Sequence, residues 1–290
     1  MKDIYAEVTD RIITALESGI IPWKRPWIGV TDYAISYATG KPYSLLNQIL
    51  LDEPGEYITF NACKRAGGHV KKGAKAKMVV FWKMLQVSET DANGNVKTTA
   101  DGQPMMKDIP ILKYDQVFNL NDCEGIERKH PDEELSDTKP IDEAENILTG
   151  YVTRSGLTLR HEKQNRAFYR PSEDLIVLPL REQFRDPAEY YATAFHEATH
   201  STGHKNRLNR LSTGDDAAFG SESYSREELV AEIGSAACLN RLGIETPDTF
   251  QNTAAYIQGW LKALKNDKKL IVTAAGRAEK AVSMIFGDAE

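Results

Sequence analysis

The chain has 290 residues, of which 41% are hydrophobic and 27% charged, with 20 Gly and 12 Pro. This composition is typical of a folded globular protein and excludes collagen-like, low-complexity and wholly disordered chains. No run approaches the roughly 18 apolar residues that a membrane helix needs, and the first residues lack the basic and apolar regions of a signal peptide. The three cysteines, Cys63, Cys123 and Cys238, lie far apart without a Cys-x-x-Cys pair, which indicates neither a disulfide framework nor a thiolate zinc site. We therefore expect a cytoplasmic protein with no membrane partner.

Charge is distributed unevenly along the chain. Residues 1–120 carry 15 Lys and Arg against 13 Asp and Glu, whereas residues 121–290 carry 21 against 29. The segment 61–88 holds seven basic residues and no acid, and the segment 122–145 holds ten acids. The length fits one large domain or two modest ones, and because the charge changes sign in a segment with few apolar residues, we interpret residues 126–140 as an acidic linker between a domain of residues 1–125 and a domain of residues 141–290.

Hydrophobic periodicity predicts an α+β N-terminal domain. Apolar residues at helical spacing indicate a helix over residues 4–16. Runs of β-branched and aromatic residues then predict strands at residues 56–60, 77–85 and 109–120. The polar segment between the last two strands, with Asn93-Gly94 at its tip, is typical of a long hairpin loop.

The second half of the chain has a more helical pattern. We expect a helix at residues 141–151, short strands near residues 157–159 and 175–178, and a helix through residues 190–202. Further helices are expected at about residues 226–242, 247–264 and 268–286. The fold class is therefore α+β with two domains, the second mainly helical with a small sheet.

An H-E-x-x-H motif lies inside the predicted helix over residues 190–202 and consists of His196, Glu197 and His200. Residues four apart on an α-helix lie one turn apart and about 40° around its axis, so both imidazoles can bind one metal ion. The Glu197 carboxylate lies beside them, where it can take a proton from a water molecule that the ion activates. The motif predicts one Zn²⁺ ion, although the same ligand types also accept manganese or another divalent metal.

A catalytic zinc site needs a third protein ligand while one position stays open. In one pattern that ligand is a histidine six residues after His200, but Asn206 stands there and His204 comes two residues too early. The alternative is a glutamate on the next helix, where the sequence REELVAEIG contains Glu227, Glu228 and Glu232.

Helical geometry separates these three glutamates. Glu228 and Glu232 share one face of the helix, and Glu227 points about 100° away. One of the first two can therefore bind the metal while the other hydrogen-bonds a ligand histidine. We select Glu228 as the ligand, with Glu232 as the outer residue or the alternative ligand.

Other polar residues near the motif are candidates for contact with a substrate. The strand within AFYRPSEDLIVLP precedes the motif helix and can pair with an extended substrate by strand addition. Tyr224 and the basic residues Lys205, Arg207 and Arg210 are candidates for stabilising an oxyanion or holding substrate.

The N-terminal domain interleaves aromatic with basic residues and contains no catalytic constellation. Single-stranded nucleic acid binds to cationic grooves with flat rings on which bases stack, each stack contributing about 1–3 kcal/mol. We therefore predict single-stranded nucleic acid as a partner of this domain. The candidate residues for this binding are Trp23, Lys24, Arg25, Trp27, Lys64, Arg65, Lys71, Lys72, Lys75, Lys77 and Trp82.

Several blocks of the sequence together resemble the ArdC antirestriction family, whose N-terminal domain also occurs on plasmid primases. In the first half these are GIIPWKRPW, KPYSLLNQILL, YITFNACKRAGGHVKKGAKAKMVVFW and VFNL, and in the second half HEATHSTGHKNRLNR and SREELVAEIG. The resemblance implies a single-stranded-DNA-binding domain followed by a zincin-like metallopeptidase domain of the SprT-like kind. It also implies a plasmid-borne protein that shields incoming DNA from host restriction enzymes. The family's metal motif matches His196, Glu197 and His200, and its acidic helix motif matches Glu228 and Glu232.

Two other functions fit the same residues. One is a cytosolic zinc peptidase without a nucleic-acid role, whose N-terminal domain recognises a protein substrate. The other is a DNA-binding protein whose metal site is structural or vestigial. Glu197 argues against the second, because a structural site has no use for a carboxylate aimed at the open coordination position.

Overall fold

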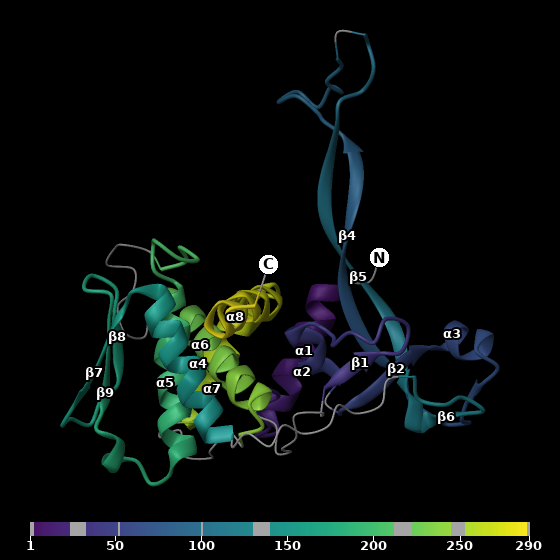
Figure 1. The fold of residues 1–290 in the computed structure, drawn as a ribbon. Coiled ribbons are helices and arrows are strands. Elements are labelled where there is room, and N and C mark those ends of the chain that lie inside the picture. The colour runs from purple at the N-terminus through teal and green to yellow at the C-terminus, as the bar shows by residue number, and fades with distance from the viewer. Residues whose placement is uncertain are drawn as a thin grey trace.

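A computed structural model describes residues 3–23, 33–51, 53–99, 101–129, 140–211, 222–244 and 253–288. Figure 1 shows a helical body with a small sheet at its outer side, and a second sheet from which a long two-stranded ribbon projects. The secondary structure agrees with the predicted α+β class, with helices dominating the second half. None of the described helices is long and apolar enough to cross a membrane.

Helix α1 (Ile4–Glu17) confirms the predicted opening helix. It begins where the Asp3 carboxylate accepts a hydrogen bond from the Ala6 N–H group at 3.2 Å, which satisfies one of the free N–H groups of the first turn. Val8, Ile12 and Leu16 lie on one face and are buried. The apolar spacing seen in the sequence therefore marks the face that packs into the core.

The N-terminal sheet has the strand order β1-β2-β5-β4. Strand β1 pairs with β2 in parallel, and the other two pairings are antiparallel. The predicted strands and hairpin are confirmed, and β1 is an addition to them. The strand bounds are β1 (Ala34–Ser36), β2 (Gly55–Thr59), β4 (Lys77–Ser88) and β5 (Met106–Asn119).

Helix α2 (Leu45–Leu51), which no sequence pattern predicted, binds both edges of this sheet. The Asn47 amide donates to the Val80 carbonyl of edge strand β4 at 2.7 Å and accepts from the Val80 N–H group at 2.8 Å. The Gln48 amide does the same for Ala34 on edge strand β1, at 2.8 and 2.9 Å. Two buried polar side chains thus satisfy edge backbone groups that would otherwise lack partners.

A small lobe next to β2 carries most of the basic segment, and we call residues 60–76 the basic lobe. It contains α3 (Phe60–Arg65) and β3 (His69–Val70). Strand β3 pairs with β6 (Cys123–Glu124), and β6 follows the 3-10 helix η1 (Leu120–Asp122) in the chain. Gly68 has to be small, because a Cβ atom there would lie 2.7 Å from the Glu124 carbonyl oxygen. All three cysteines are free and buried, and Cys63 and Cys123 lie in the same apolar cluster.

The C-terminal half confirms the predicted helices and adds one strand, β8. Its sheet has the order β7-β9-β8, with β7 parallel and β8 antiparallel to β9. Residues 247–252 of one predicted helix lie outside the described residues. The elements are α4 (Pro140–Ser155), β7 (Thr158–Glu162), β8 (Phe168–Arg170), β9 (Leu175–Pro179), η2 (Arg181–Gln183), α5 (Pro187–Thr202), α6 (Glu222–Arg241), α7 (Thr253–Asn266) and α8 (Leu270–Phe286).

The two halves of the chain share one hydrophobic core. Helices α1 and α2 pack with α6, α7 and α8, so that Ile12 and Ile49 lie in the same cluster as Leu229 and Ile233. The domain boundaries at residues 125 and 141 remain a prediction, and most of the segment between them lies outside the described residues. Since α6 carries the predicted glutamate ligand, the shared core links this helix directly to the N-terminal half.

Candidate metal centre

Helix α5 holds the H-E-x-x-H motif in a buried position. The helix begins at Asp186, whose carboxylate accepts from the Glu189 N–H group at 3.0 Å, with Pro187 in the first turn. Tyr190, Phe195 and other apolar residues bury one side of it. His196 and Glu197 are only 6% and 7% exposed. The capping residue Asp186 and Pro187 therefore set the start of the helix, and the buried apolar side sets the direction in which the motif side chains point.

Helix α6 approaches α5 closely because of a glycine. A Cβ atom on Gly234 would lie 2.7 Å from the Cγ2 atom of Thr199, so a larger residue would push the two helices apart. The Ser235 hydroxyl donates to the Ala192 carbonyl of α5 at 2.7 Å. This close contact brings the carboxylates near the start of α6 against the two histidines.

The structure brings His196, His200 and Glu228 together as the sequence predicts. The two Nε2 atoms of the histidines lie 3.1 Å apart. The Glu228 carboxylate oxygens lie 3.5 Å from Nε2 of His196 and 3.4 Å from Nε2 of His200. Atoms that bind one ion tetrahedrally at about 2.1 Å lie about 3.4 Å from one another. This spacing fits a divalent metal, and these three residues can hold one.

A carboxylate also faces the other nitrogen of each histidine. Glu232 Oε1 lies 3.6 Å from Nδ1 of His196, and Glu227 Oε1 lies 3.4 Å from Nδ1 of His200. Such outer carboxylates orient ligand imidazoles and fix which nitrogen carries the proton. Glu232 lies next to a candidate ligand histidine, and its role as outer residue or alternative ligand remains a prediction. The spacing of the motif predicts no role for Glu227, which lies on a different face of the helix from Glu228.

Arg210 holds Glu227 in place. Its guanidinium donates to Glu227 Oε1 at 2.8 Å and to the Thr202 hydroxyl at 2.7 Å, and its side chain is 5% exposed. The chain can fold back here because Gly203 ends α5, and a Cβ atom there would lie 2.8 Å from Leu211 Cγ. The prediction that Arg210 contacts an oxyanion or substrate is wrong, because its donors are used inside the protein.

Arg207 is likewise an internal residue, and its predicted role at an oxyanion or substrate is wrong. It donates to the Ser201 carbonyl of α5 at 2.8 Å and to Asp174 Oδ2 at 2.9 Å. Asp174 also accepts from the Tyr169 hydroxyl at 2.7 Å. Burial raises the pKa of Asp174, but hydrogen bonds from Arg207 and Tyr169 outweigh it and hold that pKa below its ordinary value. The pair ties the β8–β9 turn to the end of the motif helix.

The two remaining substrate candidates have different environments. Lys205 is exposed, and Tyr224 is half-buried near the start of α6. Their predicted roles at an oxyanion or substrate remain predictions.

The glutamate charges at the centre have a larger effect on the pKa values of the two histidines than burial has. Burial alone would lower the pKa of His200, but Glu227 and Glu228 raise it to about 10. Burial alone would also lower the pKa of His196, but a hydrogen bond with Glu228 and the charges of Glu197 and Glu232 raise it above its ordinary value. Burial raises the pKa of Glu228, yet the two histidines hold it well below its usual range. An environment that favours cations at this point suits a divalent ion.

The predicted DNA-binding residues fall into three groups. The first group, Trp23, Lys71 and Lys77, makes its contacts inside the protein. Trp23 is 2% exposed and packs edge to face on Trp260 at a ring distance of 5.2 Å, so the prediction that it stacks on bases is wrong. Lys71 donates to the Asn121 carbonyl, and Lys77 forms an ion pair with Glu53 at 3.1 Å, so both are engaged within the protein.

The second group is exposed. Trp82 is 55% exposed, and the four basic residues Lys64, Arg65, Lys72 and Lys75 are exposed on the basic lobe. The third group, Lys24, Arg25 and Trp27, lies outside the described residues. Phe60 is 56% exposed on α3, one helical turn before Lys64, although the sequence analysis did not single it out.

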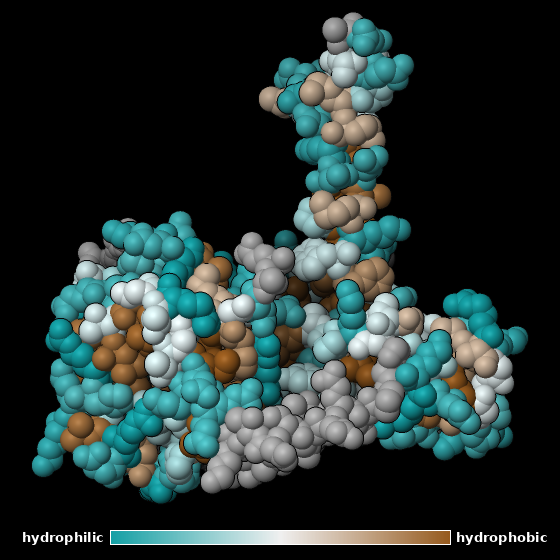
Figure 2. All heavy atoms as spheres, viewed as in Figure 1, coloured by the Kyte–Doolittle hydropathy of each residue, from teal (hydrophilic) through white to brown (hydrophobic). Residues whose placement is uncertain are grey.

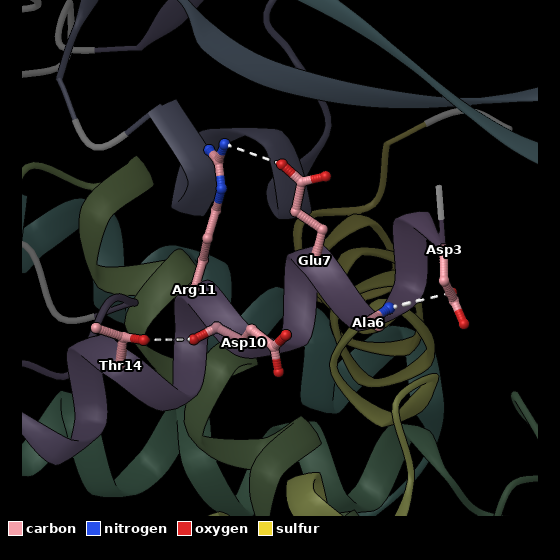
Figure 3. Close-up of a pocket in the computed structure, with 6 residues that line it drawn as sticks. All are labelled: Asp3, Ala6, Glu7, Asp10, Arg11 and Thr14. Atoms are coloured by element: carbon pink, nitrogen blue, oxygen red, sulfur yellow. Dashed lines mark hydrogen bonds and ion pairs between the residues drawn. The ribbon is translucent and has the colours of Figure 1, made fainter. Parts of the chain in front are cut away.

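A hollow of about 560 Å³ lies along α1, away from the metal ligands (Figure 3). Its polar groups bind one another along the helix, as where Arg11 donates to Glu7 at 3.4 Å and the Thr14 hydroxyl donates to the Asp10 carbonyl at 2.8 Å. We assign it no function. The lining residues are Asp3, Ala6, Glu7, Asp10, Arg11 and Thr14.

Comparisons with known proteins agree with this arrangement. Residues 2–118 match the N-terminal domain of anti-restriction factor ArdC, and residues 143–277 match a zincin-like metallopeptidase family. The metal-free crystal structure of the antirestriction ArdC protein from plasmid R388 has a TM-score of 0.76 and 34% identity over 98% of this chain and 97% of that one. The chain belongs to the ArdC antirestriction family. The Mn(II)-bound structure of the R388 protein has a TM-score of 0.73 and 33% identity over the same shares of both chains.

ArdC-like sequence also occurs inside larger proteins. Two DNA primase TraC proteins of Escherichia coli are 37% and 36% identical over 98% and 96% of this chain. The match spans only 27% and 19% of their own lengths. An uncharacterized protein, y4eC, of Sinorhizobium fredii is 29% identical over 96% of this chain and 90% of its own. The ArdC unit is therefore found both nearly alone and as part of a primase.

Proposed function

We propose that this protein binds single-stranded DNA and thereby protects incoming plasmid DNA from host restriction. We further propose that it holds one divalent ion, zinc or manganese, on His196, His200 and Glu228. Membership of the antirestriction family supports the first part. The 3.1 to 3.5 Å spacing of the three ligand groups is the observation that carries the second.

The DNA surface that we propose lies on the N-terminal half. Four exposed basic side chains of the basic lobe and the exposed ring of Trp82 supply cationic and stacking groups. Titration of labelled single-stranded and duplex oligonucleotides at two salt concentrations tests it. We expect tighter binding of the single strand and a steep loss of affinity with salt. Equal, weak and salt-insensitive binding to both would contradict the proposal.

The metal centre has the residues of a hydrolase. A divalent ion there supplies a Lewis acid that lowers the pKa of a bound water. Glu197 is buried beside the ligands on the same helix but is not one of the three, so its carboxylate is available to accept and return a proton. A carboxylate oxygen lies 3.6 Å from Nδ1 of His196 and 3.4 Å from Nδ1 of His200, an arrangement that favours Nε2 of each histidine as the nitrogen that would bind a metal. We propose hydrolysis as the chemistry of the centre.

Exchange of Glu197 for Gln tests whether protection of DNA requires hydrolysis at the metal centre or only binding to DNA. The Glu197→Gln protein keeps the shape and the three ligands, so metal content and melting temperature should match the parent, while any hydrolytic step loses its proton acceptor. Protection of unmodified DNA in cells is the readout. Loss of protection with metal and DNA binding retained supports a hydrolytic role. Full protection by the variant shows that occupancy of DNA is sufficient.

A further inference from the structure

Strands β4 and β5 extend well beyond the sheet to which they belong. Strand β2 pairs with β5 only at residues 117–119, so residues 106–116 of β5 pair with β4 alone. We call residues 81–88 and 106–113 the arm. Figure 1 shows the arm projecting from the N-terminal sheet away from the rest of the molecule. An isolated two-stranded ribbon of this kind is marginally stable in water.

The arm region carries most of the exposed large apolar side chains. Within the part of the chain that the structure describes, ten such residues are exposed and eight lie between residues 81 and 114. Figure 2 shows apolar and polar side chains alternating along the ribbon. Trp82, Met84 and Met106 are each more than half exposed. Apolar exposure of this extent marks a surface that binds another molecule.

The strand register separates two faces of the arm. Residues that pair directly across the strands share a face, and successive residues alternate. The pairs Phe81–Lys113, Lys83–Ile111, Leu85–Ile109 and Val87–Lys107 therefore form one face. Its lysines are exposed, and it contains no acid. The opposite face carries Trp82 and Met84, with Asp108 as the acidic residue of the arm.

The charge of the arm indicates what kind of partner it binds. With Lys83, Lys107 and Lys113 against Asp108, the arm is cationic in a chain of net charge -6. None of the three lysines forms an ion pair with another described residue. Strand β4 also continues the acid-free segment that forms the basic lobe. A polyanion that also presents flat apolar groups fits both the lysines and the apolar side chains.

We propose that the arm is a binding surface for single-stranded DNA that follows the outer edge of β4, with phosphates towards the lysine face and unstacked bases against Trp82 and Met84 on the opposite face. This inference rests on the proposed function and extends the DNA surface beyond the basic lobe. A single strand is preferred over a duplex, because a duplex keeps the faces of its bases inside the stack. The apolar side chains of the arm gain contacts only when bases are exposed.

The lysines are tested in the full-length protein by the triple variant Lys83→Gln, Lys107→Gln, Lys113→Gln. We expect the slope of log affinity against log salt for an oligothymidylate to fall by about 2, since each phosphate contact on a single strand contributes about 0.7. The matched control removes the same charge from exposed residues of the C-terminal half, as Lys163→Gln, Arg166→Gln, Lys280→Gln. The control should leave the slope unchanged.

The apolar side chains are tested by Trp82→Ala with Met84→Ala. We expect at least about a tenfold loss of oligothymidylate affinity and little change for a duplex of the same length. Because both side chains are exposed, the melting temperature should stay within a few degrees of the parent. Quenching of tryptophan fluorescence by the oligonucleotide should also weaken in Trp82→Phe, since Trp23 and Trp260 are buried.

The outcomes separate the arm from the proposed function. A parent protein that fails to bind oligothymidylate contradicts both. A parent that binds, with arm variants that bind equally well, overturns the role of the arm and leaves the basic lobe as the DNA surface. Arm variants that keep DNA binding but change the oligomeric state in size-exclusion chromatography overturn it in favour of a protein partner.

Discussion

The metal centre and the arm satisfy their side chains in opposite ways. At the centre, His196 and Glu228 are under 10% exposed, and a carboxylate faces both nitrogens of each histidine. On the arm, Trp82 and Met84 are more than half exposed. The first site is assembled by the fold before any ligand arrives, so it needs little rearrangement to bind one. The second surface gains its contacts from the partner. Changes at the centre should therefore alter stability as well as binding, whereas changes on the arm should alter binding alone.

Removal of Glu228, the proposed third ligand, should have the largest effect. Glu228→Ala leaves two histidines facing an empty position next to other buried carboxylates, so we expect metal affinity to fall more than about 100-fold and the melting temperature of the metal-loaded protein to fall. Glu232→Gln is the comparison, because an outer residue costs about 10- to 100-fold. Metal titration monitored by calorimetry measures both. If the Glu228→Ala protein binds metal like the parent and the Glu232→Gln protein does not, then Glu232 is the metal ligand and Glu228 is the outer residue.

The contact between α5 and α6 should be the next most sensitive. Gly234→Ala places a methyl group against Thr199, so we expect a loss of about 2 kcal/mol in the free energy of unfolding together with weaker metal binding. The control is Gly276→Ala on α8, where no atom lies within 4 Å of the added methyl group. That change should be neutral or stabilising by up to about 1 kcal/mol, as for alanine in an open helix. Denaturant unfolding of both variants decides, and a neutral Gly234→Ala would contradict the packing.

Loss of the Glu227 charge should have a smaller effect. Glu227→Gln keeps the shape but removes the carboxylate between Arg210 and His200, so we expect about a tenfold loss of metal affinity with the three ligands intact. Glu162→Gln, on an exposed position of β7, should leave the affinity unchanged. Competition with a chelator measures the difference. Equal affinities in the two variants would show that Glu227 does not orient His200.

The Asp174–Arg207 pair should contribute least, and its contribution should depend on pH. The folded pKa of Asp174 is below its ordinary value near 3.8, so the pair stabilises the protein above about pH 4 and less as pH falls towards the folded pKa. Asp174→Asn should cost about 1 kcal/mol at pH 7 and progressively less towards pH 3. Asn tolerates the positive φ of 48° at this position. Melting curves at several pH values, with exposed Glu162→Gln as control, measure the cost, and a cost independent of pH would contradict the ion pair.

Local periodicity explains which parts of the centre could be predicted. The spacing of His196 and His200 and the shared face of Glu228 and Glu232 follow from helix geometry alone. Glu227 was missed because that reasoning considers one face of the helix, whereas an imidazole presents a second nitrogen on its other side. The roles of Arg207 and Arg210 depend on the chain folding back after Gly203, which residue spacing does not reveal.

The N-terminal half shows a different limit. Its strands and hairpin follow from β-branched and aromatic runs, and these were predicted. Trp23 was assigned to DNA because it precedes basic residues, yet its ring packs on Trp260 from the far end of the sequence. Helix α2 was missed because Asn47 and Gln48 interrupt its apolar pattern, and their partners are edge strands that only the tertiary structure brings near.

The most direct measurement is the anomalous diffraction of crystals of the protein grown with Mn²⁺ or Zn²⁺. We predict one peak per chain, about 2.0 to 2.2 Å from Nε2 of His196, Nε2 of His200 and a Glu228 oxygen, with Glu227 and Glu232 outside the coordination sphere. A peak bound by Glu232 in place of Glu228, or full metal loading with no peak between the two histidines, would contradict the centre described above.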